Sequence, residues 1–188
     1  GIILAGGQAT RMGGGDKCLL PLGGTPLLSR IIERLAPQVD TIALNANGDA
    51  ARFAEYDVAV VADSIAGFAG PLAGVLSGLD HAATTGHSHV VSIAGDTPFF
   101  PCDLVPHLQL AGGNVGLALA ASPSGRQPTF GIWPVALRED LRDALHAGTR
   151  KVVQWTEVHN AGTATFPEDA AFFNVNTPAD LAAAEAML

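Results

Sequence analysis

The chain has 188 residues and a mass of 19.2 kDa, a size that suits one domain built around a single hydrophobic core. Its formal net charge of −8, with ten lysines and arginines in total, excludes a general nucleic-acid-binding protein, because such proteins place many cations against phosphates. Hydrophobic residues make up 48% of the chain, and no apolar run reaches the roughly 20 residues that span a bilayer. We therefore expect a soluble protein with neither a nucleic-acid nor a membrane partner.

The two cysteines, Cys18 and Cys102, form neither a C-x-x-C motif nor a metal cluster. No secretory signal precedes the first predicted strand. We expect a cytoplasmic protein in a reducing environment, with Cys18 as a small core residue.

The first chemical signal is a short apolar run, residues 2–4, followed by a glycine-rich segment that ends at Lys17. Five glycines in this segment allow positive φ angles and a close backbone approach to a ligand, while Arg11 and Lys17 supply cations. The segment is no Walker loop, because Cys18 rather than Ser or Thr follows Lys17, and it contains no G-x-G-x-x-G. The pattern predicts a strand that opens into a binding loop for a nucleoside triphosphate.

Strands and helices are then predicted to alternate along the chain. Apolar residues at helical spacing predict a helix over 26–36, with Pro26 in its first turn. Short buried strands are predicted at 41–44 and 58–61, with a weaker helical stretch at 50–56 between them. The alternation continues with a helix at 71–84, a strand at 89–94, a segment at 103–111, strands at 115–121 and 129–133, a helix at 135–147 and a final helix from Pro178.

This alternation predicts a doubly wound α/β fold, with a mainly parallel sheet covered by helices on both faces. Ligands of such folds bind outside the carboxyl ends of the strands. The glycine-rich segment, Asn45 with Asn47, Asp63 and Asp96 each follow a predicted strand. We expect these polar groups to meet along one edge of the sheet.

Each candidate site residue also has a structural interpretation. Asp96 could hold Mg²⁺ against phosphates, yet Asp before Thr-Pro also forms turns. Asp63 precedes Ser64 in a plausible turn, and Asn45 and Asn47 could contact a base or ribose or complete a turn. Arg11 and Lys17 could be solvated surface charges. Because glycines flank them, we expect them instead to neutralise charge on the α-phosphate and on the departing pyrophosphate.

The segment Leu4-Ala5-Gly6-Gly7, with Arg11-Met12-Gly13 and Asp16-Lys17, resembles the signature of sugar-nucleotide and cofactor nucleotidyltransferases. Further segments resemble the MobA family of molybdenum cofactor guanylyltransferases more specifically, and the resemblance covers nearly the whole chain. These segments are residues 70–74, 96–99, 127–130 and 173–178.

The resemblance implies that the enzyme joins GMP from Mg·GTP to the terminal phosphate of molybdopterin and releases pyrophosphate. It implies Lys17 at the phosphates and Asp96 as the Mg²⁺ ligand. Together with Arg11, whose role follows from its place in the glycine-rich segment, these are the predicted catalytic residues. The implied GTP-binding residues are Leu4, Ala5 and Gly6 through their backbone, Lys17 at the phosphates, Asn45 and Asp63 at the nucleoside end, and Asp96 at the metal. Whether Asp63 reaches the base or the ribose is left open.

The same resemblance divides the single domain into a GTP-binding half, about 1–100, and a molybdopterin-binding half, about 101–188. Asn174 and Asn176 are expected at the acceptor, with Arg150 and Lys151 as cations for the pterin phosphate. The two asparagines could instead form only a turn before Pro178. Gln127 stands where the family often has His, so its role is open.

We expect in-line attack of the acceptor phosphate on the α-phosphorus of GTP, with no general base. Transient contact with molybdoenzyme apoproteins or delivery chaperones is expected as well. Two alternatives are a CTP-dependent molybdopterin cytidylyltransferase and a non-catalytic protein that delivers the cofactor.

Overall fold

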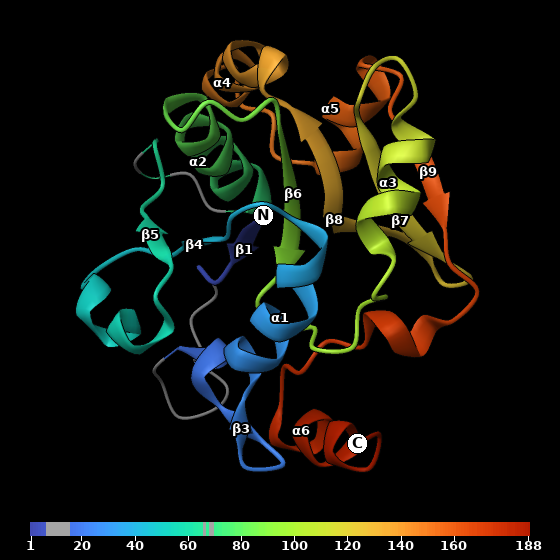
Figure 1. Ribbon diagram of the computed structural model, residues 1–188. Helices are drawn as coiled ribbons and strands as arrows, with labels where there is room; N and C mark the ends of the chain where they lie inside the picture. The colour runs from blue at the N-terminus through green and yellow to red at the C-terminus, as the bar shows by residue number, and fades with distance from the viewer. Residues whose placement is uncertain (7–15, 66, 68–69) are drawn as a thin grey trace.

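A mainly parallel sheet forms the centre of the computed structural model, which describes residues 1–6, 16–65, 67 and 70–188 (Figure 1). Its order across the described residues is β5-β4-β1-β6-β8-β7-β9. The β8 strand is antiparallel to both neighbours, and every other pair is parallel. The strands are β1 (Ile2–Leu4), β4 (Ala43–Asn45), β5 (Ala59–Val61), β6 (His89–Ala94), β7 (Ala118–Ser122), β8 (Gly125–Pro134) and β9 (Gly162–Thr165). The predicted α/β class is confirmed.

The register of the four parallel strands positions the site. Leu4 of β1 pairs with Asn45 of β4 on one side and with Ala94 of β6 on the other, and Asn45 pairs with Val61 of β5. These four residues form one lateral row, and each is the last residue of its strand. The segments that follow all four strands therefore leave the sheet at the same level.

Helices cover both faces of the sheet, as the continuous apolar strands predict. Most buried residues of α1 pack with those of α3 in one core cluster, and the buried apolar residues of α2, α4 and α5 belong to a second cluster on the other face. The helices are α1 (Leu27–Leu35), α2 (Pro71–Thr84), α3 (Leu104–Gly112), α4 (Arg138–His146), α5 (Val152–Val158) and α6 (Pro178–Glu185). Within the described residues, we find no helix that is long and apolar enough to cross a membrane.

Helix α2 packs closely on the strands that lead into the site because two of its residues lack a side chain. A Cβ at Gly78 would lie 3.0 Å from Cβ of Ile2, and a Cβ at Gly74 would lie 2.8 Å from Cδ2 of Leu4. The same Cβ at Gly74 would collide with Oδ1 of Asn45. The helix can therefore approach β1 and β4 only where glycine is present.

The C-terminal segment returns to the same edge of the sheet. Figure 1 shows α6 and the C-terminus below the sheet, whereas α4 and α5 lie above it. A small apolar cluster attaches α6 to the antiparallel hairpin of β2 (Pro21–Leu22) and β3 (Thr25–Pro26); it contains Leu22, Leu27, Val175 and Ala184. The backbone N–H of Val175 donates to the carbonyl of Asp96 at 2.8 Å, which fixes the returning segment beside the end of β6.

Several local predictions differ from the structure. Pro26 lies just before α1 as its N-cap, not in the first turn, and residues 50–56 form a 3₁₀ helix. The predicted helix over 135–147 is a 3₁₀ turn, Val135–Leu137, followed by α4. The hairpin, α5 and β9 were not predicted, because each is short and lacks a long apolar pattern.

We expect Leu76→Ala to lower the free energy of unfolding by about 2–5 kcal/mol, because Leu76 is fully buried under the sheet and its truncation leaves a cavity. The matched control is Leu110→Ala on α3, where the side chain is 82% exposed and the change should stay within about 0.5 kcal/mol. Urea denaturation of the two variants checks this. Equal losses in both would contradict the described burial.

Candidate active site

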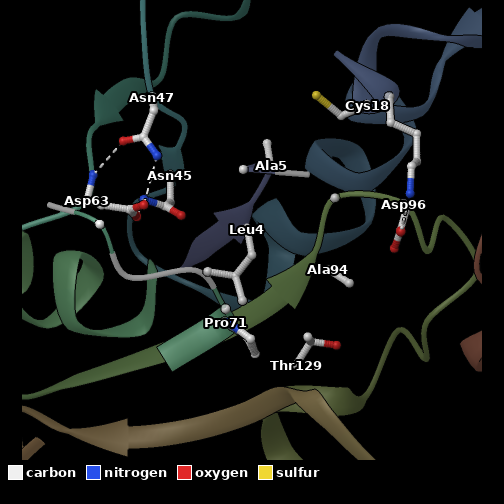
Figure 2. A pocket seen from close by; sticks show the side chains of 15 residues that line it. Leu4, Ala5, Cys18, Asn45, Asn47, Asp63, Pro71, Ala94, Asp96 and Thr129 are labelled. Carbon is white, nitrogen blue, oxygen red and sulfur yellow. Dashed lines mark hydrogen bonds and ion pairs between the residues drawn. The ribbon is translucent and has the colours of Figure 1, made fainter. Parts of the chain in front are cut away.

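A cavity of about 620 Å³ lies at the carboxyl edge of the sheet, where the segments that follow the four parallel strands begin (Figure 2). Its lining includes every predicted nucleotide-binding residue that the structure describes. These are Leu4, Ala5, Gly6, Lys17, Asn45, Asp63 and Asp96. The remaining predicted catalytic residue, Arg11, lies outside the described residues.

One end of the cavity holds a closed network of two asparagines and one aspartate. The side-chain amide of Asn45 donates to Oδ1 of Asp63 at 3.0 Å, and that of Asn47 donates to Oδ2 at 2.7 Å. The Asp63 backbone N–H donates back to Oδ1 of Asn47 at 2.9 Å, and Figure 2 shows these contacts around Asp63. Both carboxylate oxygens of Asp63 therefore accept hydrogen bonds from this chain, and Asp63 orients the two amides.

Farther along the same edge, Lys17 contacts two residues that are distant from it in the sequence. The Lys17 ammonium lies 3.1 Å from Oδ2 of Asp96 and donates to Oδ1 of Asn176 at 2.6 Å. The side chains of Lys17 and Asp96 are only 16% and 24% exposed, so water screens this ion pair less than it screens a surface pair. The structure therefore brings together a predicted phosphate-binding residue, a predicted metal ligand and a predicted acceptor residue.

The other predicted acceptor asparagine joins the same group. The Thr97 hydroxyl contacts Oδ1 of Asn174 and lies 3.2 Å from Oδ1 of Asp96. Residues 174–176 thus run beside the end of β6, with the Val175 N–H on the Asp96 carbonyl between the two asparagines. Thr97 was not among the predicted site residues, although it follows Asp96 directly.

A helix cap fixes Asn176 in place. The backbone N–H groups of Asn176 and Thr177 donate to the Asp180 carboxylate at 3.0 and 2.8 Å, and the Thr177 hydroxyl accepts from the Asp180 N–H. The hydrogen bond from Asn176, with further ones from Thr177, lowers the pKa of the Asp180 carboxyl. The Thr-Pro-Ala-Asp sequence at 177–180 carries the signal for such a capping box.

Arg52 links the Asn47 end of the cavity to Asp16, the residue before Lys17. Its guanidinium donates to the Asp16 carboxylate and, at 2.6 Å, to the Asn47 carbonyl, and it lies over the Phe53 ring at 4.5 Å. Asp16, a neighbour of Lys17, therefore pairs with Arg52. The sequence gives no signal for this contact, because 36 residues separate its partners.

Arg150 does not join this group. Its guanidinium donates to the carbonyls of Leu145, in the last turn of α4, and of Thr149, which follows that helix. Helices α4 and α5 lie at the end of the sheet opposite α6 (Figure 1). The preceding strand, β8, ends at Pro134 beside His89, the first residue of β6. The chain thus leaves the sheet toward the amino ends of the parallel strands.

Gln127 belongs to a separate hydrogen-bond network. Its amide donates to the Ser122 hydroxyl at 3.0 Å, and that hydroxyl contacts the Asp169 carboxylate. Hydrogen bonds from Ser122 and Ser124 lower the pKa of the Asp169 carboxyl. This network holds the β7–β8 turn against the 3₁₀ helix at Asp169–Phe172.

The donor set at this edge suits a metal that substrate phosphates share. In the part of the chain that the structure describes, no three His, Cys, Asp or Glu side chains gather into a metal-ligating group. Mg²⁺ commonly uses one or two carboxylates and completes its shell with phosphates and water. The Asp96 carboxylate lines the cavity and meets this requirement.

A mainly parallel α/β sheet with a lysine–aspartate pair and a cavity at its carboxyl edge is the arrangement of a nucleotidyltransferase, the class that the matching family model gives. Residues 1–163 match the MobA-like NTP transferase domain, and the chain belongs to this family. The resemblance inferred from its motifs is thereby confirmed.

Named relatives cover the chain almost completely. Over 98% of its length it is 50% identical to the molybdenum cofactor guanylyltransferase of Bradyrhizobium sp. (strain ORS 278), of which the match covers 91%. Over its whole length it is 49% identical to the protein of that name from Cereibacter sphaeroides, covering 96% of it.

Solved structures share the fold. Molybdopterin-guanine dinucleotide biosynthesis protein A from Archaeoglobus fulgidus matches with a TM-score of 0.76 at 23% identity, covering 99% of this chain and 96% of that one. A 4-diphosphocytidyl-2C-methyl-D-erythritol synthase from Anaerococcus prevotii matches with the same TM-score at 16% identity, covering 99% and 95%. These two likenesses concern the fold.

We expect Cys18 to resist thiol reagents in the native protein while the exposed Cys102 reacts. Burial, with a smaller contribution from the Asp16 carboxylate, raises the pKa of the Cys18 thiol to about 12, so the reactive thiolate is scarce at pH 8. Titration with a disulfide reagent should count one thiol before unfolding and two after it.

The Cys102→Ser variant provides the control, because its native form should show almost no reaction. Labelling of Cys18 in that variant should rise with pH as the thiol approaches its pKa of about 12. Rapid labelling of Cys18 at pH 7 would contradict its burial beside the cavity.

Proposed function

We propose that this protein transfers GMP from Mg·GTP to the terminal phosphate of molybdopterin, releasing pyrophosphate and forming the dinucleotide cofactor. The observation that carries the proposal is the contact of Lys17 with both Asp96 and Asn176 at one edge of the cavity. Relatives of about 50% identity named molybdenum cofactor guanylyltransferase support guanine as the base and this cofactor as the acceptor.

In this proposal GTP lies along the row of strand ends. Leu4, Ala5 and Gly6 line the cavity, and in this proposal their backbone binds the nucleotide. Asn45 and Asp63 bind the nucleoside at one end, with the Asn47 amide held in the same network. Lys17 binds the phosphates, and we propose the same role for Arg11.

Asp96 would hold the Mg²⁺ ion. When bound, the metal neutralises charge on the triphosphate and on the departing pyrophosphate. The Lys17 ammonium, 3.1 Å from the Asp96 carboxylate, supplies a second positive charge in a partly buried position, where it is more effective than in water. Together they would stabilise the charge that accumulates as the bond to pyrophosphate breaks.

The acceptor lies on the side of Asn174 and Asn176 in this proposal. One phosphate oxygen of molybdopterin attacks the α-phosphorus of GTP in line with the departing pyrophosphate. The attacking group is already an anion, so no general base is required. We assign the half about 1–100 to the nucleotide and the half about 101–188 to the acceptor, with the contact between Lys17 and Asn176 joining them.

The hydrogen bonds of Arg150 to the carbonyls of Leu145 and Thr149, at the end of α4, support Asn174 and Asn176 rather than Arg150 as the residues that bind the acceptor. A role for Arg150 would then be indirect. We also propose that the protein is cytoplasmic. It would deliver its product by transient contact with molybdoenzyme apoproteins or chaperones.

The expected result of a transfer assay is pyrophosphate release only when Mg²⁺, GTP and molybdopterin are all present. A thermal-shift series with GTP, CTP, ATP and UTP tests base choice alongside it, since a ligand at about 100 times its Kd adds about 2.7 kcal/mol of stability. Transfer from CTP instead would assign the protein to cytidylyl transfer. Binding of GTP without transfer would favour a delivery role.

The Asp96→Asn variant separates catalysis from binding in the same assay. We expect turnover to fall by about 100-fold or more, with a smaller change in the KM for GTP, because the lost charge matters most in the transition state. Asp57→Asn is the matched control at an exposed position, and it should leave turnover unchanged. Near-normal turnover of Asp96→Asn would contradict the metal assignment.

A further inference from the structure

Thr97 is the one buried polar residue among the described positions that touches both the predicted metal ligand and the predicted acceptor segment. Its side chain is fully buried, and it is absent from the lining of the cavity. A buried hydroxyl costs free energy unless its hydrogen bonds are made. The contacts of Thr97 therefore indicate what this residue does.

The hydroxyl of Thr97 has two polar neighbours and one proton. Oδ1 of Asp96 lies 3.2 Å away, and the side-chain amide of Asn174 lies closer. A carboxylate can only accept, whereas a half-turn of an amide exchanges its acceptor oxygen for its donor nitrogen. With the Asn174 NH₂ group donating to Thr97, the Thr97 proton is available to Asp96, and all three groups are satisfied.

This arrangement fixes both oxygens of Asp96. Oδ1 accepts from Thr97, and Oδ2 accepts from Lys17 at 3.1 Å. The Asp96 carbonyl also accepts from the Val175 N–H at 2.8 Å. The buried Thr97 hydroxyl and the Lys17 ammonium thus set the orientation of the Asp96 carboxylate.

We propose that Thr97 is a positioning residue for guanylyl transfer. Its hydroxyl orients the Asp96 carboxylate toward the divalent cation of Mg·GTP and ties that carboxylate to Asn174 on the acceptor side. The proposal rests on the proposed function. It predicts that Mg²⁺ tightens GTP binding less when the Thr97 hydroxyl is removed. Mutation of a residue that supports a metal ligand in this way commonly lowers metal affinity or activity by about 10–100-fold.

The test compares Thr97→Val, which keeps the shape and removes the hydroxyl, with Thr97→Ser, which keeps the hydroxyl. Thr156→Val is the matched control, because Thr156 is also buried and its hydroxyl bonds to the Val153 carbonyl in α5, far from the cavity (Figure 1). Calorimetry measures GTP binding with and without Mg²⁺, with no acceptor present. Steady-state assays give kcat and the KM for GTP.

We expect Mg²⁺ to tighten GTP binding in the wild type, in Thr97→Ser and in Thr156→Val, and this effect to be about 10-fold smaller in Thr97→Val. The kcat of Thr97→Val should fall by a similar factor, with little change in KM for GTP at saturating Mg²⁺. Recovery in Thr97→Ser would assign the effect to the hydroxyl.

Three results would overturn the proposal: wild-type behaviour of Thr97→Val, equal losses in Thr97→Val and Thr97→Ser, or an equal loss in Thr156→Val. Failure of the proposed function gives a different pattern. In that case wild-type protein shows no transfer to molybdopterin, while the Mg²⁺-dependent binding of GTP still reports on Thr97.

Discussion

The arrangement of this molecule depends on the parallel register of β5, β4, β1 and β6. Leu4, Asn45, Val61 and Ala94 form one row, and each ends its strand, so the four following segments emerge at one level. Asn47 and Asp63 can then meet in one network, and Asp96 can lie along the same edge. A shift of one residue in any of these strands would place its last side chain on the opposite face of the sheet.

A second consequence follows from the return of the C-terminal segment to this edge. Residues 174–176 run along the end of β6, and the Thr177–Asp180 cap holds them there. Lys17 contacts both Asp96 and Asn176, so one cation lies between the proposed nucleotide and acceptor sides. The same geometry gives Thr97 its buried position between Asp96 and Asn174. Attack by a phosphate on a neighbouring triphosphate requires such proximity and charge neutralisation more than it requires a proton-transfer group.

The sequence predicted the four parallel strands β1, β4, β5 and β6, the edge at which they end and most of the polar residues that line the cavity, because apolar runs and strand-end polar residues are local patterns. Asp63 and Asp96 were found in this way. The contacts among them were not predictable, because Arg52–Asp16 and Thr97–Asn174 join residues that are 36 and 77 positions apart. Arg150 looked suitable by charge alone, but the antiparallel β8 carries the following chain toward the other end of the sheet. A turn before Pro178 was predicted as one interpretation of Asn174 and Asn176, and the capping box at Thr177 confirms a cap there. The importance of Gly74 follows only from the packing of α2 against Asn45, which no local pattern indicates.

In the proposed reaction, one nucleotide lies along the row of strand ends, with its phosphates at Lys17 and its nucleoside at Asn45 and Asp63. The most direct measurement is a crystal structure of the full chain with Mg²⁺ and a non-hydrolysable GTP analogue. The account predicts the triphosphate within hydrogen-bonding distance of Lys17, a metal ion on Asp96, and the base or ribose against the Asn45–Asp63 network. A nucleotide bound elsewhere, or bound with its base at Lys17 and its phosphates at Asp63, would contradict it.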